Sequence, residues 1–192
     1  MSGQSVPPTT IAGSQPPPLK IPDAFTEATL ATELGQRLSG PPAAGGATLT
    51  RQRAAGQVIW VDAGSEVMVH LASVQTHIAD GLLLVAVDFE CDQTGRTTMV
   101  ASFAMNSGSD AAGLFSATDE LPRGNGLLAA RWGRIYQDAV WAALTGLISD
   151  HAAERKLFPL GLICAKGMLT LRSGTPLIAS QLASGGVPGV TR

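Results

Sequence analysis

Residues 79–105, ADGLLLVAVDFECDQTGRTTMVASFAM, contain the strongest structural signal in this chain. Two mostly apolar runs, Leu82–Glu90 and Thr97–Met105, are separated by the turn sequence CDQTGR. Asp80-Gly81 precedes the first run and is a typical two-residue hairpin turn. Turns this short join antiparallel neighbours. The stretch therefore predicts consecutive antiparallel strands, the start of a β-meander.

Alternation within the first run separates two faces of the predicted sheet. The odd-numbered residues from Leu83 to Cys91 are all apolar, so this face belongs to the core. The even-numbered residues from Leu82 onward turn acidic at Asp88 and Glu90. The second face is therefore semi-apolar and rich in small residues. We expect such a face to receive the long helix, another subunit or a ligand.

The flanking sequence extends this meander into an α+β fold. Upstream, residues 57–79 predict two more strands that turn at 62–65, and residues 49–53 suggest a short edge strand. Downstream, residues 125–151 predict one long helix, and residues 156–174 predict a hairpin that turns at Lys166-Gly167. The fold class is thus an antiparallel meander of about four strands plus a C-terminal hairpin, packed by one long helix.

A short N-terminal helix begins near Asp23, which is the predicted N-cap. Leu30, Leu34 and Leu38 recur at helical spacing, and Gly40 with the two prolines that follow ends the helix. A last short helix is predicted over residues 175–185.

The chain divides into a leader, one domain and a tail. Residues 1–22 hold half of the 12 prolines, and Lys20 is their only charged side chain. This composition predicts a disordered leader, with a short peptide that docks on a neighbouring subunit as the alternative. Residues 23–184 form the predicted α+β domain, which contains a long loop before the long helix, and residues 185–192 form a flexible tail.

Composition excludes several classes of function. Only 15 % of residues are charged, the net charge is −2, and no basic stripe is present for nucleic acid. The N-terminus lacks the pattern of a signal peptide, and no run of 18 apolar residues predicts a membrane span. Two cysteines cannot form a disulfide framework, so we expect free thiols and a cytoplasmic protein.

Few residues have the spacing of a reaction centre. Asp88 and Glu90 share one face and could bind a cation or act in acid–base chemistry, but a solvated strand end is the simpler interpretation. His70 and His77 fall on opposite faces unless a bulge intervenes, and Cys91 falls on the core face. No nucleophile elbow or phosphate-binding loop occurs. We therefore predict no catalytic residue, no metal and no cofactor.

The long helix has an apolar arc of about 200°, wider than contact with a single sheet requires. Either the N-terminal helix or another subunit should cover the excess. Aromatic residues are enriched at protein interfaces. The predicted interface residues are Trp132, Tyr136, Val140, Trp141 and Ile148.

Three functions fit these features. The leading hypothesis is a non-enzymatic assembly or binding protein, either a homo-oligomer or a subunit of a larger complex, with its partner surface on the long helix and the second sheet face. The alternative is a small-molecule-binding protein or enzyme with a pocket between helix and sheet, lined by Trp60, Met68, His70, Met99, Trp132 and Tyr136. A further alternative is a secretion-type chaperone, because the order of elements is similar to that of secretion chaperones, without a shared motif.

Overall fold

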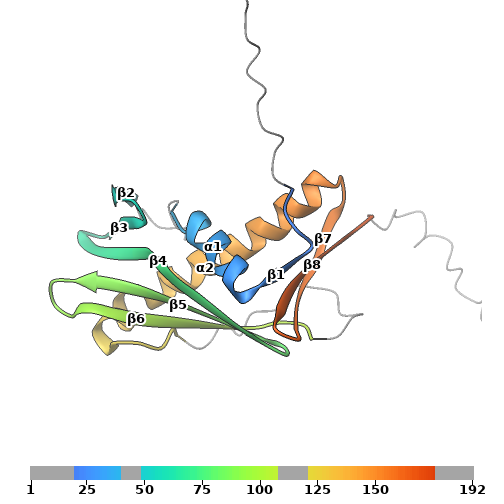
Figure 1. The fold of residues 1–192 in the computed structure, drawn as a ribbon. Coiled ribbons are helices and arrows are strands. Elements are labelled where there is room, and N and C mark those ends of the chain that lie inside the picture. The colour runs from blue at the N-terminus through green and yellow to red at the C-terminus, as the bar shows by residue number, and fades with distance from the viewer. Residues whose placement is uncertain (1–19, 40–48, 108–120, 176–192) are drawn as a thin grey trace, which may run out of the picture.

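The fold is described from a computed structural model, which places residues 20–39, 49–107 and 121–175 (Figure 1). In chain order the elements are β1 (Ala24–Thr26), α1 (Glu27–Arg37), β2 (Leu49–Ala54), β3 (Gln57–Asp62), β4 (Ser65–Ala79), β5 (Leu82–Cys91), β6 (Gly95–Ala104), α2 (Gly126–Glu154), β7 (Phe158–Ala165) and β8 (Met168–Gly174). The predicted α+β class is confirmed. The predictions for the leader before Lys20, for most of the helix at 175–185 and for the tail lie outside the described residues.

The strands form two antiparallel sheets. The larger sheet has the order β2-β3-β4-β5-β6, so the predicted meander includes the short edge strand as a fifth member. The smaller sheet has the order β1-β8-β7 and contains the predicted C-terminal hairpin. Glycines with positive φ lie in the turns at Gly81 and Gly167, where the left-handed backbone favours glycine.

The start of α1 corrects the predicted cap. Residues 24–26 are extended and pair antiparallel with β8, so the helix begins only at Glu27. Thr26 is the N-cap, and its side chain and that of Thr29 form a reciprocal capping box. Asp23 lies outside the helix and binds His151 and Arg155 instead. A strand of three residues gave too weak a sequence signal to be separated from the helix that follows.

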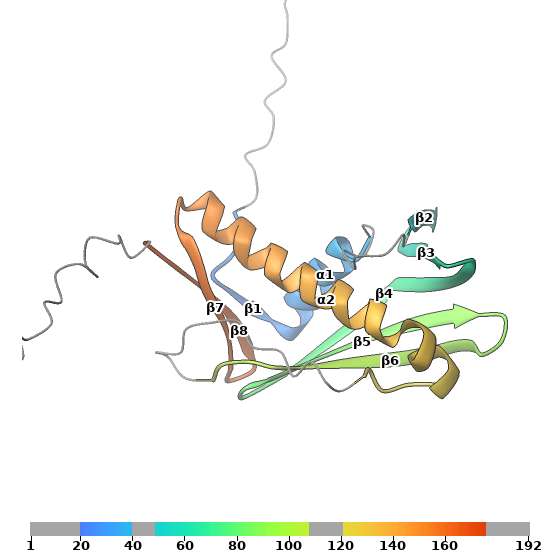
Figure 2. The same ribbon diagram turned by 180° about the vertical axis from the view of Figure 1, so that it is seen from behind.

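The two helices lie on the same face of the larger sheet, and α2 continues beyond it to β7 and β8 (Figures 1 and 2). Helix α2 contacts β6, β7, β8 and α1. The buried apolar residues of both sheets and both helices form one core cluster. The wide apolar arc of α2 is therefore covered within the chain, by the smaller sheet as well as by α1. No helix among the described residues is long and apolar enough to cross a membrane.

A bulge interrupts β4 beside α1. The register with β5 jumps from His70↔Asp88 to Gln75↔Ala86, which leaves three extra residues on β4. The Ser73 hydroxyl donates to the His70 carbonyl oxygen and accepts the Asp88 N–H, so the bulge is closed by hydrogen bonds. Helix α1 crosses here at Gly35, where a Cβ would lie 3.2 Å from the Leu71 carbonyl oxygen. The missing side chain permits this close approach.

Candidate functional site

Four of the five residues predicted as an interface are enclosed by the chain itself. They are at most 3 % exposed: Trp132, Tyr136, Val140 and Ile148. Trp141 is half-buried and stacks on Phe103, with ring centroids 5.9 Å apart. In this structure these side chains belong to the core between α2 and the sheets, and they do not form an exposed partner surface.

The six residues predicted to line a pocket are divided between the two faces of the larger sheet. Met68 and His70 pair with Glu90 and Asp88, and paired residues point to the same face. That face is opposite to the one that holds the buried residues Trp60, Met99, Trp132 and Tyr136. Phe89 makes edge-to-face contacts with Trp60 and Tyr136 at 5.6 and 5.1 Å, so aromatic rings fill the space between helix and sheet. The six residues therefore do not line one cavity.

The acidic residues at the end of β5 are bound by their neighbours. Asp88 accepts hydrogen bonds from Thr98 at 2.6 Å and from Arg96 at 2.8 and 2.9 Å. The Thr98 hydrogen bond, followed by Arg96, lowers the pKa of Asp88 against the opposing effect of burial. Glu90 lies 2.8 Å from the Nε2 atom of His70, which is buried, whereas His77 is exposed. These carboxylates take part in cross-strand pairs, and no metal-binding cluster occurs among the described residues.

Cys91 is less buried than its position on the core face predicts, because it is the last residue of β5. Burial raises the pKa of its thiol, but hydrogen bonds from Thr94 and from the Gln93 backbone outweigh this effect and lower it. Cys164 is fully buried, and burial raises its pKa to about 12. The two thiols therefore differ in reactivity.

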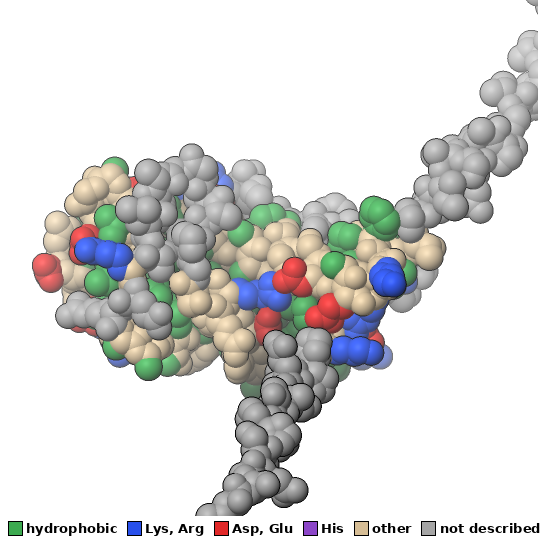
Figure 3. All heavy atoms as spheres, turned by 90° about the horizontal axis from the view of Figure 1, so that it is seen from above, with side chains coloured by type: hydrophobic (Ala, Val, Ile, Leu, Met, Phe, Trp, Pro, Cys, Tyr) green, Lys and Arg blue, Asp and Glu red, His purple; other side chains and the backbone are tan. Residues whose placement is uncertain are grey.

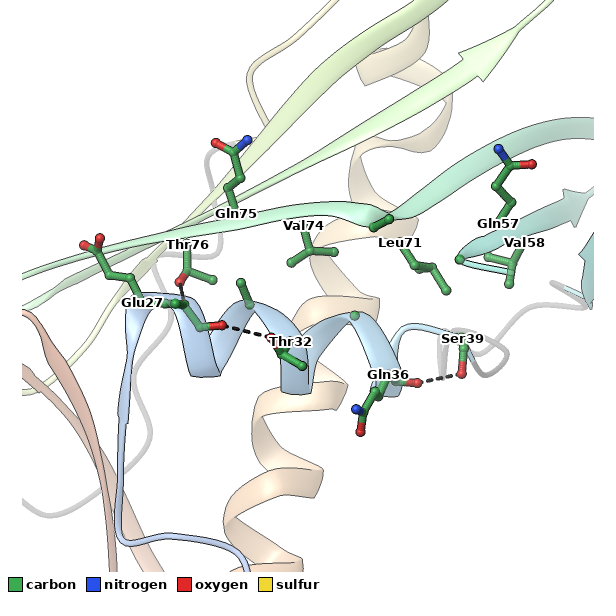
Figure 4. Close-up of a pocket in the computed structure, with 15 residues that line it drawn as sticks. Glu27, Thr32, Gln36, Ser39, Gln57, Val58, Leu71, Val74, Gln75 and Thr76 are labelled. Atoms are coloured by element: carbon green, nitrogen blue, oxygen red, sulfur yellow. Dashed lines mark hydrogen bonds between the residues drawn. The ribbon is translucent and has the colours of Figure 1, made fainter. Parts of the chain in front are cut away.

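A groove of about 890 Å³ lies between α1 and the bulge of β4, and we call it the α1–β4 groove (Figure 4). Small residues of α1, among them Ala28, Ala31 and Gly35, form one wall. The β4 bulge forms the other wall, and the first residues of β3 close one end. Leu71 and Val74 point toward α1, whereas Gln57 and Gln75 point away from it (Figure 4).

The described residues of the groove provide an apolar floor and a rim without an uncommitted charge. Among the described residues of its lining, Glu27 is the only charged one. A Glu27 carboxylate oxygen accepts the Ile78 N–H at 2.8 Å and lies 3.0 Å from Nδ1 of His77. The Ile78 hydrogen bond and the nearby His77 lower the pKa of Glu27 against the opposing effect of burial, which keeps the carboxylate ionised and engaged. By contrast, the side-chain amides of Gln36 and Gln57 form no hydrogen bond within the described part of the chain.

The sequence contained part of this site. Ala28, Ala31 and Gly35 recur at helical spacing beside the leucine stripe of α1, which leaves one side of the helix without large side chains. The second wall depends on the bulge in β4, and the alternation of apolar and polar residues does not reveal a bulge of three residues. Sequence reasoning therefore missed the groove.

The surrounding surface carries charges of both signs. On the face seen from above, basic and acidic side chains are interspersed among apolar and polar ones (Figure 3). No protein-family model matches the chain, and comparison with curated proteins and with solved structures finds no match.

Proposed function

We propose that this chain is a non-enzymatic binding protein that holds an extended, uncharged segment of a partner protein in the α1–β4 groove. The observation that carries the proposal is the groove itself, with its apolar floor and its rim without an uncommitted charge. Its volume of about 890 Å³ is large enough for several residues of an extended chain.

The chemistry of the lining favours polypeptide over a charged metabolite. A charged ligand would lose hydration in the groove without gaining an opposite charge, which is unfavourable. An extended peptide instead offers apolar side chains for the half-buried Leu71 and for the exposed Ala28 and Ala72. We also propose a cytoplasmic location; free cysteines such as Cys91 and Cys164, which lie in different sheets, are typical of a reducing compartment.

The test is a selection of peptides from a random display library with the purified full chain. We expect enrichment of uncharged peptides that contain apolar residues. Ala28→Trp fills the groove from an exposed position on α1 and should abolish their binding. Ala130→Trp makes the same change at an exposed helical position of α2 outside the groove lining and should leave binding intact.

Both substitutions replace an exposed helical alanine, so their intrinsic effects on the helix are of similar size, about 0.5 kcal/mol. A difference between them therefore reports on the groove. If no peptide is enriched, or if the enriched peptides bind both variants equally well, the proposal fails.

A further inference from the structure

The chain itself contains a segment without charged side chains that can reach the α1–β4 groove: residues 1–19, the part of the predicted leader before Lys20, which we call the leader from here on. This segment contains no charged side chain, five prolines, and the apolar residues Val6, Ile11 and Leu19 among others. It matches the groove in charge, because the one charged group of the lining, Glu27, is already engaged.

Binding of a proline-rich segment requires hydrogen-bond donors at the rim of the groove. Proline has a backbone carbonyl but no N–H, so a proline-rich segment offers more acceptors than donors. Gln36 and Gln57 lie at the rim, and their side-chain amides form no hydrogen bond within the described residues; Gln57 points away from α1 (Figure 4), so its amide can donate to a bound segment only after its side chain turns toward the groove. The small residues of α1 leave room for pyrrolidine rings above the apolar floor.

The chain enters the described fold beside the end of α2, a few residues before the groove lining begins at Glu27. Ile21 is fixed at the end of α2, where its N–H donates to Glu154 at 3.0 Å and its carbonyl accepts from Arg155 at 2.9 Å. Five residues lie between Ile21 and Glu27 at the near end of the groove, and the six Cα–Cα steps that join them span at most about 21 Å.

The leader is long enough to return along the whole groove. The 11 residues of α1 extend the groove by about 16 Å beyond Glu27. In a polyproline conformation, 19 residues would span about 59 Å. This length exceeds the sum of the distance from Ile21 to Glu27 and the length of α1. Because the segment is tethered, its local concentration at the groove is of the order of millimolar.

We propose that residues 1–19 occupy the α1–β4 groove of the same chain and compete there with the partner segment. The inference rests on the proposed function, since one lining must accept both ligands. The leader thus acts as an internal competitor: it shields the apolar floor until a partner of higher affinity displaces it.

Photo-crosslinking of the full chain tests whether residues 1–19 occupy the α1–β4 groove. Benzoylphenylalanine replaces Ala72, an exposed residue of the groove lining, and in a control protein it replaces Ala130 on α2. We expect crosslinks from position 72 to residues 1–19 in a product of monomer mass, at least about tenfold more frequent than from position 130. Equal yields from both positions, no crosslink to residues 1–19, or a product of dimer mass alone would overturn the inference.

A charged substitution within the leader provides a second test of its binding in the groove. Ile11→Asp places a carboxylate where the groove offers no uncommitted positive charge, so the crosslink yield should fall by at least about fivefold, whereas Ile11→Val should preserve it. An unchanged yield in the aspartate variant contradicts the inference. Addition of a library-selected peptide should also lower the yield in the wild-type sequence, and failure to do so overturns the competition.

The two proposals fail in different ways. If library peptides bind at the groove but position 72 gives no crosslink to the leader, only the internal competitor is refuted. If the leader crosslinks at the groove but no library peptide is enriched, the proposed partner function is refuted.

Discussion

The buried hydroxyl of Tyr136 links α2 to the larger sheet, and its ionisation should be coupled to unfolding. Tyr136 is fully buried and donates a hydrogen bond of 2.8 Å to the Val85 carbonyl oxygen of β5. Burial raises the pKa of this hydroxyl well above its ordinary value. The native state therefore keeps the proton at a pH where the unfolded chain, with an ordinary tyrosine pKa of about 10, loses it.

The sign and size of the effect follow from this difference in bound protons. The tyrosine contribution to stability is fully present below about pH 10 and is lost as the pH rises toward the native pKa. Within that interval the unfolded state binds one proton fewer, so the free energy of unfolding falls by about 1.4 kcal/mol per pH unit.

Tyr136→Phe isolates this term because it keeps the ring contact with Phe89 and removes only the hydroxyl. At pH 8 the variant should be less stable by about 1–3 kcal/mol, because the buried Val85 carbonyl loses its donor. Above about pH 10 the difference between the two proteins should narrow by about 1.4 kcal/mol per unit, since the phenylalanine variant has no group to ionise there.

The assay combines urea unfolding at each pH with ultraviolet absorbance of tyrosinate. Tyr136 is the only tyrosine in the sequence, so the absorbance reports on this one hydroxyl. We expect tyrosinate to form together with the loss of far-ultraviolet circular dichroism. Tyrosinate formation near pH 10 in a chain that keeps its native circular dichroism would show that the Tyr136 hydroxyl ionises without unfolding and would contradict this prediction.

Three further predictions concern other parts of the fold. Iodoacetamide at pH 8 should modify Cys91 much faster than Cys164, as measured by mass spectrometry. Hydrogen bonds lower the pKa of the Cys91 thiol, whereas burial raises the pKa of the Cys164 thiol to about 12. Equal rates of modification would contradict this prediction. Gly124→Ala should destabilise the protein by about 1–3 kcal/mol, because the added Cβ would lie 2.9 and 3.0 Å from atoms of β6. Gly126→Ala serves as the control, since a Cβ at that position meets nothing within 4 Å. Equal thermal stability of the two variants would contradict the prediction. Thr26→Ala should cost about 1 kcal/mol in urea unfolding through loss of the α1 cap, whereas Thr26→Ser should cost less, and a neutral alanine variant would argue against the cap.

The larger sheet could be predicted from the sequence because its signals are local. Alternating side chains mark β5 and β6, and Asp80-Gly81 marks the turn before β5. Each of these signals spans fewer than about ten residues and depends on backbone preferences that do not need the rest of the fold.

The parts that could not be predicted depend on contacts between distant segments. The three residues of β1 become a strand only because β8, more than 140 residues later, supplies their hydrogen bonds. The bulge in β4 shifts the alternation between Val69 and Val74, both of which are buried. Local patterns carry little information about either feature.

The excess apolar arc of α2 was interpreted as a sign of a partner, and the structure offers another explanation. Leu162, Leu169 and Leu171 of the smaller sheet are buried in the same core as the helix. A sequence cannot show whether a wide apolar helix is covered by a second sheet of its own chain or by another chain, since both present the same kind of side chain. The groove likewise results from the meeting of α1 and the β4 bulge.

The most direct test of the proposed binding groove is the affinity of one library-selected, uncharged peptide for three proteins, measured by fluorescence anisotropy. We expect the dissociation constant to rise at least about tenfold, or 1.4 kcal/mol, in Ala28→Trp and to stay within about twofold of wild type in Ala130→Trp. Equal affinity for the wild type and the Ala28→Trp variant would show that the peptide binds outside the α1–β4 groove.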